Sequence, residues 1–294
     1  MPMKPVLDEF VSAGDLRFHY IQWGKQGTPI VCITGITANA FCFQAFGEGL
    51  AHDHRIIAYD LRGRGDSAKP EHGYSVAIHA DDLAKLIDAW GLERPIVLGH
   101  SLGAFIGLYF AAHYPEKLSK LILVDAGANS PWQSVDRRPA WLAVSMSRLE
   151  VPVPSFEEYL QRLKAAPFLG PYWNKYLDTY FEHDVIRRDD GSVVAKTYRD
   201  GAFEDLEDVE KRQFEPLWAR VQVPTLLLRA GQAVLVENDQ LLPEEAAMAI
   251  QSTIKDCRYA NFPALNHYTI VFGVEDGPVE EIRKFVDAEV RNSK

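Results

Sequence analysis

VLGHSLG, residues 97–103, contains the pentapeptide G-x-S-x-G with its serine at position 101. An apolar run leads into it, and the helix-forming stretch LGAFIGLYFAAHY follows it. Gly99 and Gly103 remove side chains where a sharp turn from strand to helix must pass close to its neighbours. A strand and a helix on either side of the serine are the context of a nucleophile elbow. The stretch predicts that Ser101 is a nucleophile; the alternative is a serine in an ordinary glycine-rich turn.

Short apolar runs alternate with helical patterns on both sides of this stretch. Strands that alternate with helices form a mostly parallel sheet covered on both faces. The sequence therefore predicts an α/β fold with a mostly parallel, eight-stranded sheet. The strands are expected at 8–23 (two strands), 29–33, 55–59, 95–99, 119–125, 224–229 and 256–261. The helices are expected near 40–51, 75–90, 102–114, 239–250 and 276–290.

The alternation is lost between residues 129 and 221. This segment is rich in aromatic residues, and it contains the capping-box pair Ser155 and Glu158 ahead of an amphipathic helix. It also contains a hairpin signal at 190–191, Asp-Gly. We interpret 129–221 as an inserted, mainly helical cap (lid) domain, and 1–128 together with 222–294 as the core domain. Ligands bind at the carboxyl edge of open α/β sheets, so we expect the cap to lie there.

A reactive serine needs a base and an acid. Of the nine histidines, His267 is the one in a loop after the last expected strand, which makes it the candidate base for Ser101. When the three residues follow one another in the order serine, acid, histidine, the acid usually lies a few residues after the strand that reads PTLLLR here. The sequence at that place reads AVLV, which contains no carboxylate. Asp125 ends the strand LILVD beside the elbow strand and is the preferred acid. Glu237 and Asp239 remain alternatives.

An oxyanion is best stabilised by backbone N–H groups that are oriented before charge develops. The residue after the nucleophile, Leu102, supplies one such group at a helix N-terminus. The loop after PIVCIT is expected to supply the second, from Ile36. Four further side chains are candidate pocket-lining residues: Thr37, His100, Trp132 and Trp141.

Four segments resemble the α/β-hydrolase fold superfamily, over nearly the whole chain. TGIT (34–37) is similar to its oxyanion loop, although Thr34 stands where a histidine is usual. YDLRGRGDSAKP (59–70) resembles the loop after its fourth strand, GHSLGA (99–104) its elbow, and NHYTI (266–270) its histidine loop. The resemblance implies the α/β-hydrolase sheet with an inserted cap.

Within that superfamily, ITGITAN, the apolar AVLV and Asp125 resemble a smaller group. It includes N-formylmaleamate deformylase and 2-(acetamidomethylene)succinate hydrolase, whose acid also follows the sixth strand. The resemblance implies hydrolysis of amides of small carboxylated substrates without metal or cofactor. It also implies that Ser101, Asp125 and His267 correspond to the catalytic residues. Fold alone does not fix function, so the substrate does not transfer.

Composition limits the other functions. The net charge is −10, and no basic stripe exists that could replace counterions along nucleic-acid phosphates. No segment reaches membrane-spanning length, and the three cysteines are scattered, as buried structural thiols would be. No G-x-G-x-x-G, P-loop or metal-ligand spacing is present, so we expect neither cofactor nor metal. The expected protein is cytoplasmic, without nucleic-acid or membrane partners; a homodimer is left open.

These observations together predict a cofactor-independent serine hydrolase. It would cleave a small carboxylic ester, lactone or amide through an acyl-enzyme. Two alternatives remain open. The same three residues could hydrolyse a C–C bond or act as a cofactor-free lyase, or the fold could serve as a non-catalytic ligand receptor.

Overall fold

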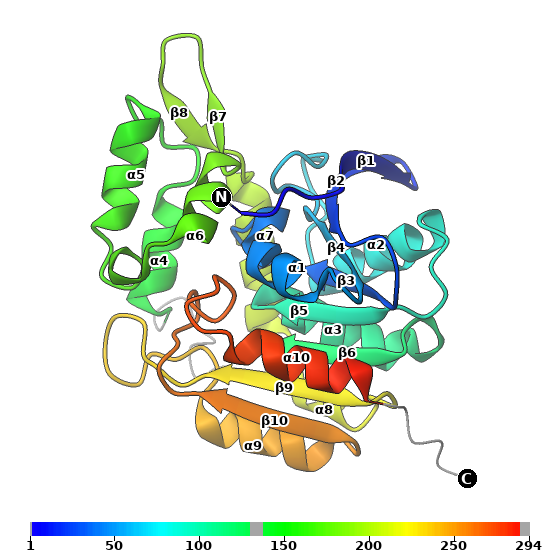
Figure 1. Cartoon of the computed structure of the whole chain (residues 1–294). Helices are drawn as coiled ribbons and strands as arrows, with labels where there is room; N and C mark the ends of the chain where they lie inside the picture. The colour runs from blue at the N-terminus through cyan, green and yellow to red at the C-terminus, as the bar shows by residue number, and fades with distance from the viewer. Residues whose placement is uncertain (1, 130–137, 289–294) are drawn as a thin grey trace.

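The computed structural model describes residues 2–129 and 138–288, and eight strands of this part form one twisted sheet (Figure 1). These strands are β1 (Leu7–Ala13), β2 (Leu16–Trp23), β3 (Pro29–Ile33), β4 (Arg55–Tyr59), β5 (Ile96–His100), β6 (Lys120–Val124), β9 (Thr225–Ala230) and β10 (Cys257–Phe262). Their order is β1-β2-β4-β3-β5-β6-β9-β10. β2 is antiparallel to β1 and β4, and the other neighbouring pairs are parallel. The predicted fold class is confirmed.

Helices cover both faces of the sheet and enclose two apolar cores. Successive residues of a strand point to opposite faces, so Cys32 of β3 lies in one core and Ile33 in the other. The helices are α1 (Gln44–Leu50), α2 (Val76–Ala89), α3 (Leu102–His113), α9 (Glu244–Thr253) and α10 (Gly277–Asp287), with short 3₁₀ turns η1 (Ala40–Phe43) and η2 (Pro115–Lys117). Residues of α1 and α10 pack in the core of Cys32, and residues of α2, α3 and α9 pack in the core of Ile33.

A segment of different architecture joins β6 to β9. It holds α4 (Ala140–Ser147), α5 (Phe156–Lys164), η4 (Gly170–Tyr172), α6 (Lys175–Glu182), β7 (Val185–Arg187), β8 (Val193–Ala195), α7 (Arg199–Lys211) and α8 (Glu215–Trp218). β7 and β8 form a separate two-stranded antiparallel sheet, and this hairpin stands with α4, α5 and α6 beside the main sheet in Figure 1.

The segment reaches the loop that follows β3. The Asn39 side chain donates to the carbonyl oxygen of Tyr180 at 3.3 Å, and Arg148 donates to that of Thr37 at 3.2 Å. Because β3 ends at Ile33, these contacts place the segment at the carboxyl edge of the sheet.

Side-chain caps fix the starts of some helices, and one expected helix begins late. Ser75 and Ser155 cap α2 and α5, since each side-chain oxygen accepts a backbone N–H three residues on. The helix expected from 239 instead begins at Glu244, after Pro243. Asp239 holds the preceding turn by accepting three backbone N–H groups. Within the described residues, no helix is long and apolar enough to cross a membrane.

Candidate active site

Ser101 lies on a strained turn between β5 and α3. Its φ of 57° and ψ of −122° are unusual for a residue with a side chain, and such strain is frequent at functional sites. The two flanking glycines make the turn feasible. A Cβ on Gly99 would lie 2.0 Å from the carbonyl oxygen of Gly103, and one on Gly103 would lie 2.0 Å from that of Ile33.

Gly103→Ala tests this close approach. The new methyl would meet backbone of β3, which cannot yield without moving the sheet. We expect the variant to lose about 2–3 kcal/mol of unfolding free energy, as overpacking does, and to lose activity as well. Gly107→Ala is the matched control in the same helix, because its Cβ would meet only side chains, the nearest at 3.3 Å. Urea unfolding should leave Gly107→Ala within about 1 kcal/mol of the wild type; equal losses in both would contradict the explanation.

Three residues from separate strand ends meet at this turn. His267, in the loop after β10, has Nε2 3.0 Å from Ser101 Oγ. Its Nδ1 lies 2.8 Å from Oδ2 of Asp125, which follows β6. The other oxygen of Asp125 accepts the N–H of Ala230, at the end of β9, at 2.9 Å. This is the geometry of a nucleophile, its base and an acid that orients the base.

Two backbone N–H groups border the serine. Gly35 lies against it, since a Cβ there would be 3.3 Å from Ser101 Cβ and 3.7 Å from Oγ. Among the described residues, no acceptor takes the N–H of Ile36, the next residue, or that of Leu102, the first residue of α3. The carbonyl oxygen of Ile36 accepts from Nε of the buried Arg64 at 2.9 Å, which fixes the loop. The N–H groups of Ile36 and Leu102 therefore stay the candidate oxyanion donors.

Comparison with known proteins identifies the family of the chain. A family model described as the alpha/beta hydrolase fold matches residues 28–274, which is most of the chain. The chain belongs to the alpha/beta hydrolase family.

Relatives of this alpha/beta hydrolase have several activities in their names. N-formylmaleamate deformylase of Pseudomonas putida is 27% identical over 77% of this chain and 79% of its own length. A cis-3-alkyl-4-alkyloxetan-2-one decarboxylase of Shewanella oneidensis is 32% identical over 50% of this chain and 46% of its own. The crystal structure of E-2-(acetamidomethylene)succinate hydrolase superposes with a TM-score of 0.84 at 22% identity, covering 96% of this chain and 99% of the other. The resemblance to this group is thereby confirmed, and the structural match shows the fold.

Burial sets the protonation of the base. It lowers the pKa of His267 to about 3, so the imidazole is neutral at pH 7 and Nε2 can accept a proton. Burial raises the pKa of Asp125 to about 7, while the N–H of Ala230 acts against that rise by stabilising the carboxylate. The two groups share a hydrogen bond and titrate as a pair.

The pH dependence of kcat/KM follows from this pair. Because the pKa of Asp125 is raised to about 7, the His267–Asp125 pair takes up a proton as the pH falls through about 7. The pair then holds either a protonated imidazole or a neutral Asp125, and neither form can remove the Ser101 proton and stabilise the resulting imidazolium. We expect kcat/KM to be level above about pH 8 and to fall about tenfold per pH unit below about 7. A pH series on an ester with a non-ionising leaving group measures this. A level profile from pH 5.5 to 8 would contradict the assignment.

The two alternative acids lie elsewhere. Glu237 is exposed. Asp239 is buried, and its carboxylate accepts hydrogen bonds from the backbone N–H groups of Val234, Leu235 and Val236. Neither contacts His267 in the described structure. The apolar AVLV stretch thus forms a turn closed by its own aspartate, and Asp125 from the neighbouring strand reaches the imidazole instead.

A cavity of about 360 Å³ opens over Ser101 between the sheet and the inserted segment. Thr37, His100 and Trp141 line it, while Trp132 falls outside the described residues. The Trp141 ring lies 5.1 Å from that of His267, and the His100 ring lies 4.7 Å from it. His100 Nε2 is 2.9 Å from the carbonyl oxygen of His267. Because that oxygen only accepts, Nε2 carries the proton, and His100 helps to hold the histidine loop.

Sequence reasoning did not find two polar pairs that involve residues of the cavity wall. The hydroxyl groups of Ser145 and Tyr268 form a hydrogen bond of 2.5 Å. Arg148, which lines the cavity, forms an ion pair with Asp184 at 2.5 Å. The position of Tyr268 beside His267 was a usable signal for the first pair. No sequence pattern links residues 148 and 184, because their meeting depends on how α4 packs against the turn after α6.

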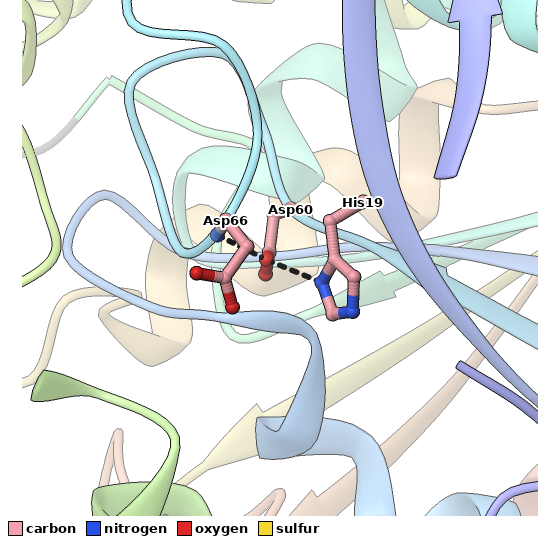
Figure 2. Close-up of side chains that lie close together, drawn as sticks. All are labelled: His19, Asp60 and Asp66. Atoms are coloured by element: carbon pink, nitrogen blue, oxygen red, sulfur yellow. Dashed lines mark hydrogen bonds and ion pairs between the residues drawn. The ribbon is translucent and has the colours of Figure 1, made fainter. Parts of the chain in front are cut away.

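His19, Asp60 and Asp66 lie close together and resemble a metal-ligand set (Figure 2). The atoms that could bind a metal already take part in hydrogen bonds within the protein. His19 Nδ1 lies 2.7 Å from Asp60 and its Nε2 lies 2.8 Å from Asp8, while Asp60 also accepts the N–H groups of Ala40 and Asp66. Burial opposes protonation of His19, but the two carboxylates outweigh it and raise its pKa to about 9. A protonated imidazole offers no lone pair to a metal, so this cluster fixes the loops around residues 40 and 66.

Proposed function

We propose that this alpha/beta hydrolase is a cofactor-independent serine hydrolase that cleaves a carboxylic ester, lactone or amide through an acyl-enzyme. The observation that carries the proposal is the chain of contacts from Ser101 through His267 to Asp125, at 3.0 and 2.8 Å. The N–H groups of Ile36 and Leu102, which no acceptor in the described part of the chain takes, supply the electrophilic part of the same mechanism.

Acylation begins when Ser101 Oγ attacks the substrate carbonyl carbon and Nε2 of His267 accepts its proton. The oxygen of the tetrahedral intermediate takes the negative charge, and the N–H groups of Ile36 and Leu102 donate to it. Asp125 stays ionised, accepts the Nδ1–H and stabilises the imidazolium. His267 then protonates the leaving alcohol or amine as its bond to carbon breaks, which leaves the acyl group on Ser101.

Deacylation repeats these steps with water. His267 removes a proton from water, the hydroxide attacks the acyl carbon, and the same two N–H groups hold the oxyanion. Collapse returns the proton to Ser101 and releases the carboxylic acid. We propose that residues 129–221 act as a cap in this cycle, since side chains from α4 and α5 line the cavity over Ser101.

A substrate panel tests the reaction class. It should contain 4-nitrophenyl esters, γ-lactones and N-formyl and N-acetyl amides, the last because N-formyl and acetamido groups occur in the names of two relatives. We expect hydrolysis of at least one class with no added metal or cofactor, and no loss in the presence of EDTA. No hydrolysis of any class, together with no labelling by a fluorophosphonate, would contradict the proposal.

The same panel, extended by a β-diketone with a matched ester, separates the alternatives. A C–C bond hydrolase would be labelled by the fluorophosphonate but would cleave a β-diketone faster than the matched ester. A ligand receptor would bind compounds without turnover and would leave Ser101 unlabelled, because the label reports an activated serine.

A further inference from the structure

The cavity over Ser101 contains few charged side chains. Among the described lining residues, Arg148 and Arg162 carry a charge, and His100 and His267 have pKa values lowered to about 3 by burial. Most of the rest are apolar or aromatic. The acyl group of a substrate bound to Ser101 therefore meets mainly apolar surface, and any full charge on it depends on these arginines.

Arg148 is the inner of the two and is already neutralised. Its side chain is 16% exposed, and the side chain of its partner Asp184 is 2% exposed. Nη1 donates to Asp184 at 2.5 Å and to the Tyr159 hydroxyl at 2.9 Å, and Nη2 donates to the carbonyl oxygen of Thr37. Tyr159 also donates to Asp184. Arg148 is one of the residues that line the cavity, whereas Asp184 is not one of them.

A substrate carboxylate beside Arg148 would therefore not meet a free cation. It would join a pair whose charges already cancel, and one negative charge would remain unbalanced in a largely apolar space. Burial of an unpaired charge is strongly unfavourable. A neutral ester or alkyl group has no such cost.

Arg162 lies at the solvent end of the cavity. It is 56% exposed and pairs with Glu158 one helical turn away, an arrangement of little energetic value. Val144 and Val151, exposed by 49% and 46%, also line this end. Two exposed valines form an apolar mouth, which suits a chain that extends from Ser101 towards solvent.

We propose that the substrate of this site carries an uncharged, mainly apolar acyl group, and that Asp184 enforces this selection by neutralising Arg148. This inference rests on the proposed serine hydrolase function.

Two esters of equal chain length test the selection. 4-Nitrophenyl hexanoate and the 4-nitrophenyl monoester of adipic acid differ in having a methyl or a carboxylate at the far end of the acyl chain. For the wild-type enzyme we expect kcat/KM to be at least 100-fold higher for hexanoate. Equal rates, or faster hydrolysis of the adipate ester, would overturn the proposal without any variant.

Asp184→Asn tests the cause. It keeps a side chain that can hydrogen-bond Tyr159 but leaves Arg148 unpaired, so the preference for hexanoate should shrink at least tenfold. Glu158→Gln is the matched control, because it frees the exposed Arg162, whose charge water screens; its ratio should stay within twofold of wild type. The double variant R148M/D184N removes both charges and should keep the wild-type ratio. An unchanged ratio in a folded Asp184→Asn protein would overturn the role of Asp184.

Fluorophosphonate labelling distinguishes failure of the proposed substrate class from failure of the proposed serine hydrolase function. A protein labelled at Ser101 that hydrolyses the adipate ester alone, or neither ester, contradicts the substrate class while the activated serine stands. A folded protein that is not labelled and hydrolyses neither ester contradicts the serine hydrolase function, and the substrate class falls with it.

Discussion

Replacement of Ser101 by alanine is expected to lower kcat by about 10⁴–10⁶-fold on any ester that the wild type hydrolyses. The variant keeps the N–H groups of Ile36 and Leu102 and the His267–Asp125 pair, but it has no atom that can form the acyl-enzyme. Rate loss of this size identifies the nucleophile, because removal of a side chain that only binds substrate would cost far less.

The fold of Ser101→Ala should be intact. Residue 101 already has a φ of 57°, and alanine meets the same backbone strain as serine, so the unfolding free energy should change by less than about 1 kcal/mol. Circular dichroism and urea unfolding check this beside the kinetic assay. Activity within tenfold of wild type in a folded variant would remove Ser101 from the mechanism.

Asp125→Asn is expected to lower kcat by about 10³–10⁴-fold. The amide introduced at this position can donate its N–H to Nδ1 of His267, which places the imidazole proton on Nε2 instead. Nε2 then faces Ser101 as a donor and cannot accept the hydroxyl proton. The loss should appear in kcat more than in KM, because Asp125 lies behind the histidine and lines no part of the cavity.

Glu237→Gln is the control for this change. Glu237 is exposed in the loop after β9, where acids of this fold are expected by resemblance, and it touches no part of the site in the described structure. Its kcat should stay within about twofold of wild type. A collapse of kcat in Glu237→Gln alone would place the acid in that loop and reverse the assignment.

The sequence predicted the sheet and led to the proposed catalytic residues Ser101, Asp125 and His267, because each follows a recognisable strand. A strand, a helix and two glycines surround Ser101, so the elbow could be read from adjacent residues. Asp125 and His267 follow strands, and parallel strands bring their carboxyl ends to one edge of the sheet. Topology alone therefore placed them near each other.

The wall of the cavity could not be predicted in the same way. Arg148 was one of many arginines in the inserted segment, and nothing local distinguishes it from the exposed Arg162. Its role depends on Asp184, which approaches through tertiary packing. Asp239 has a sequence position that suits a catalytic acid, but its carboxylate binds the N–H groups of the preceding turn instead of His267.

Intact-mass spectrometry during turnover detects the proposed acyl-enzyme on Ser101 itself. Wild-type protein mixed with 4-nitrophenyl hexanoate and quenched in acid should gain the mass of one hexanoyl group, and peptide mapping should locate it on Ser101. Ser101→Ala should gain none. Turnover of the ester with an unmodified Ser101, or with the acyl group on another residue, would contradict the account.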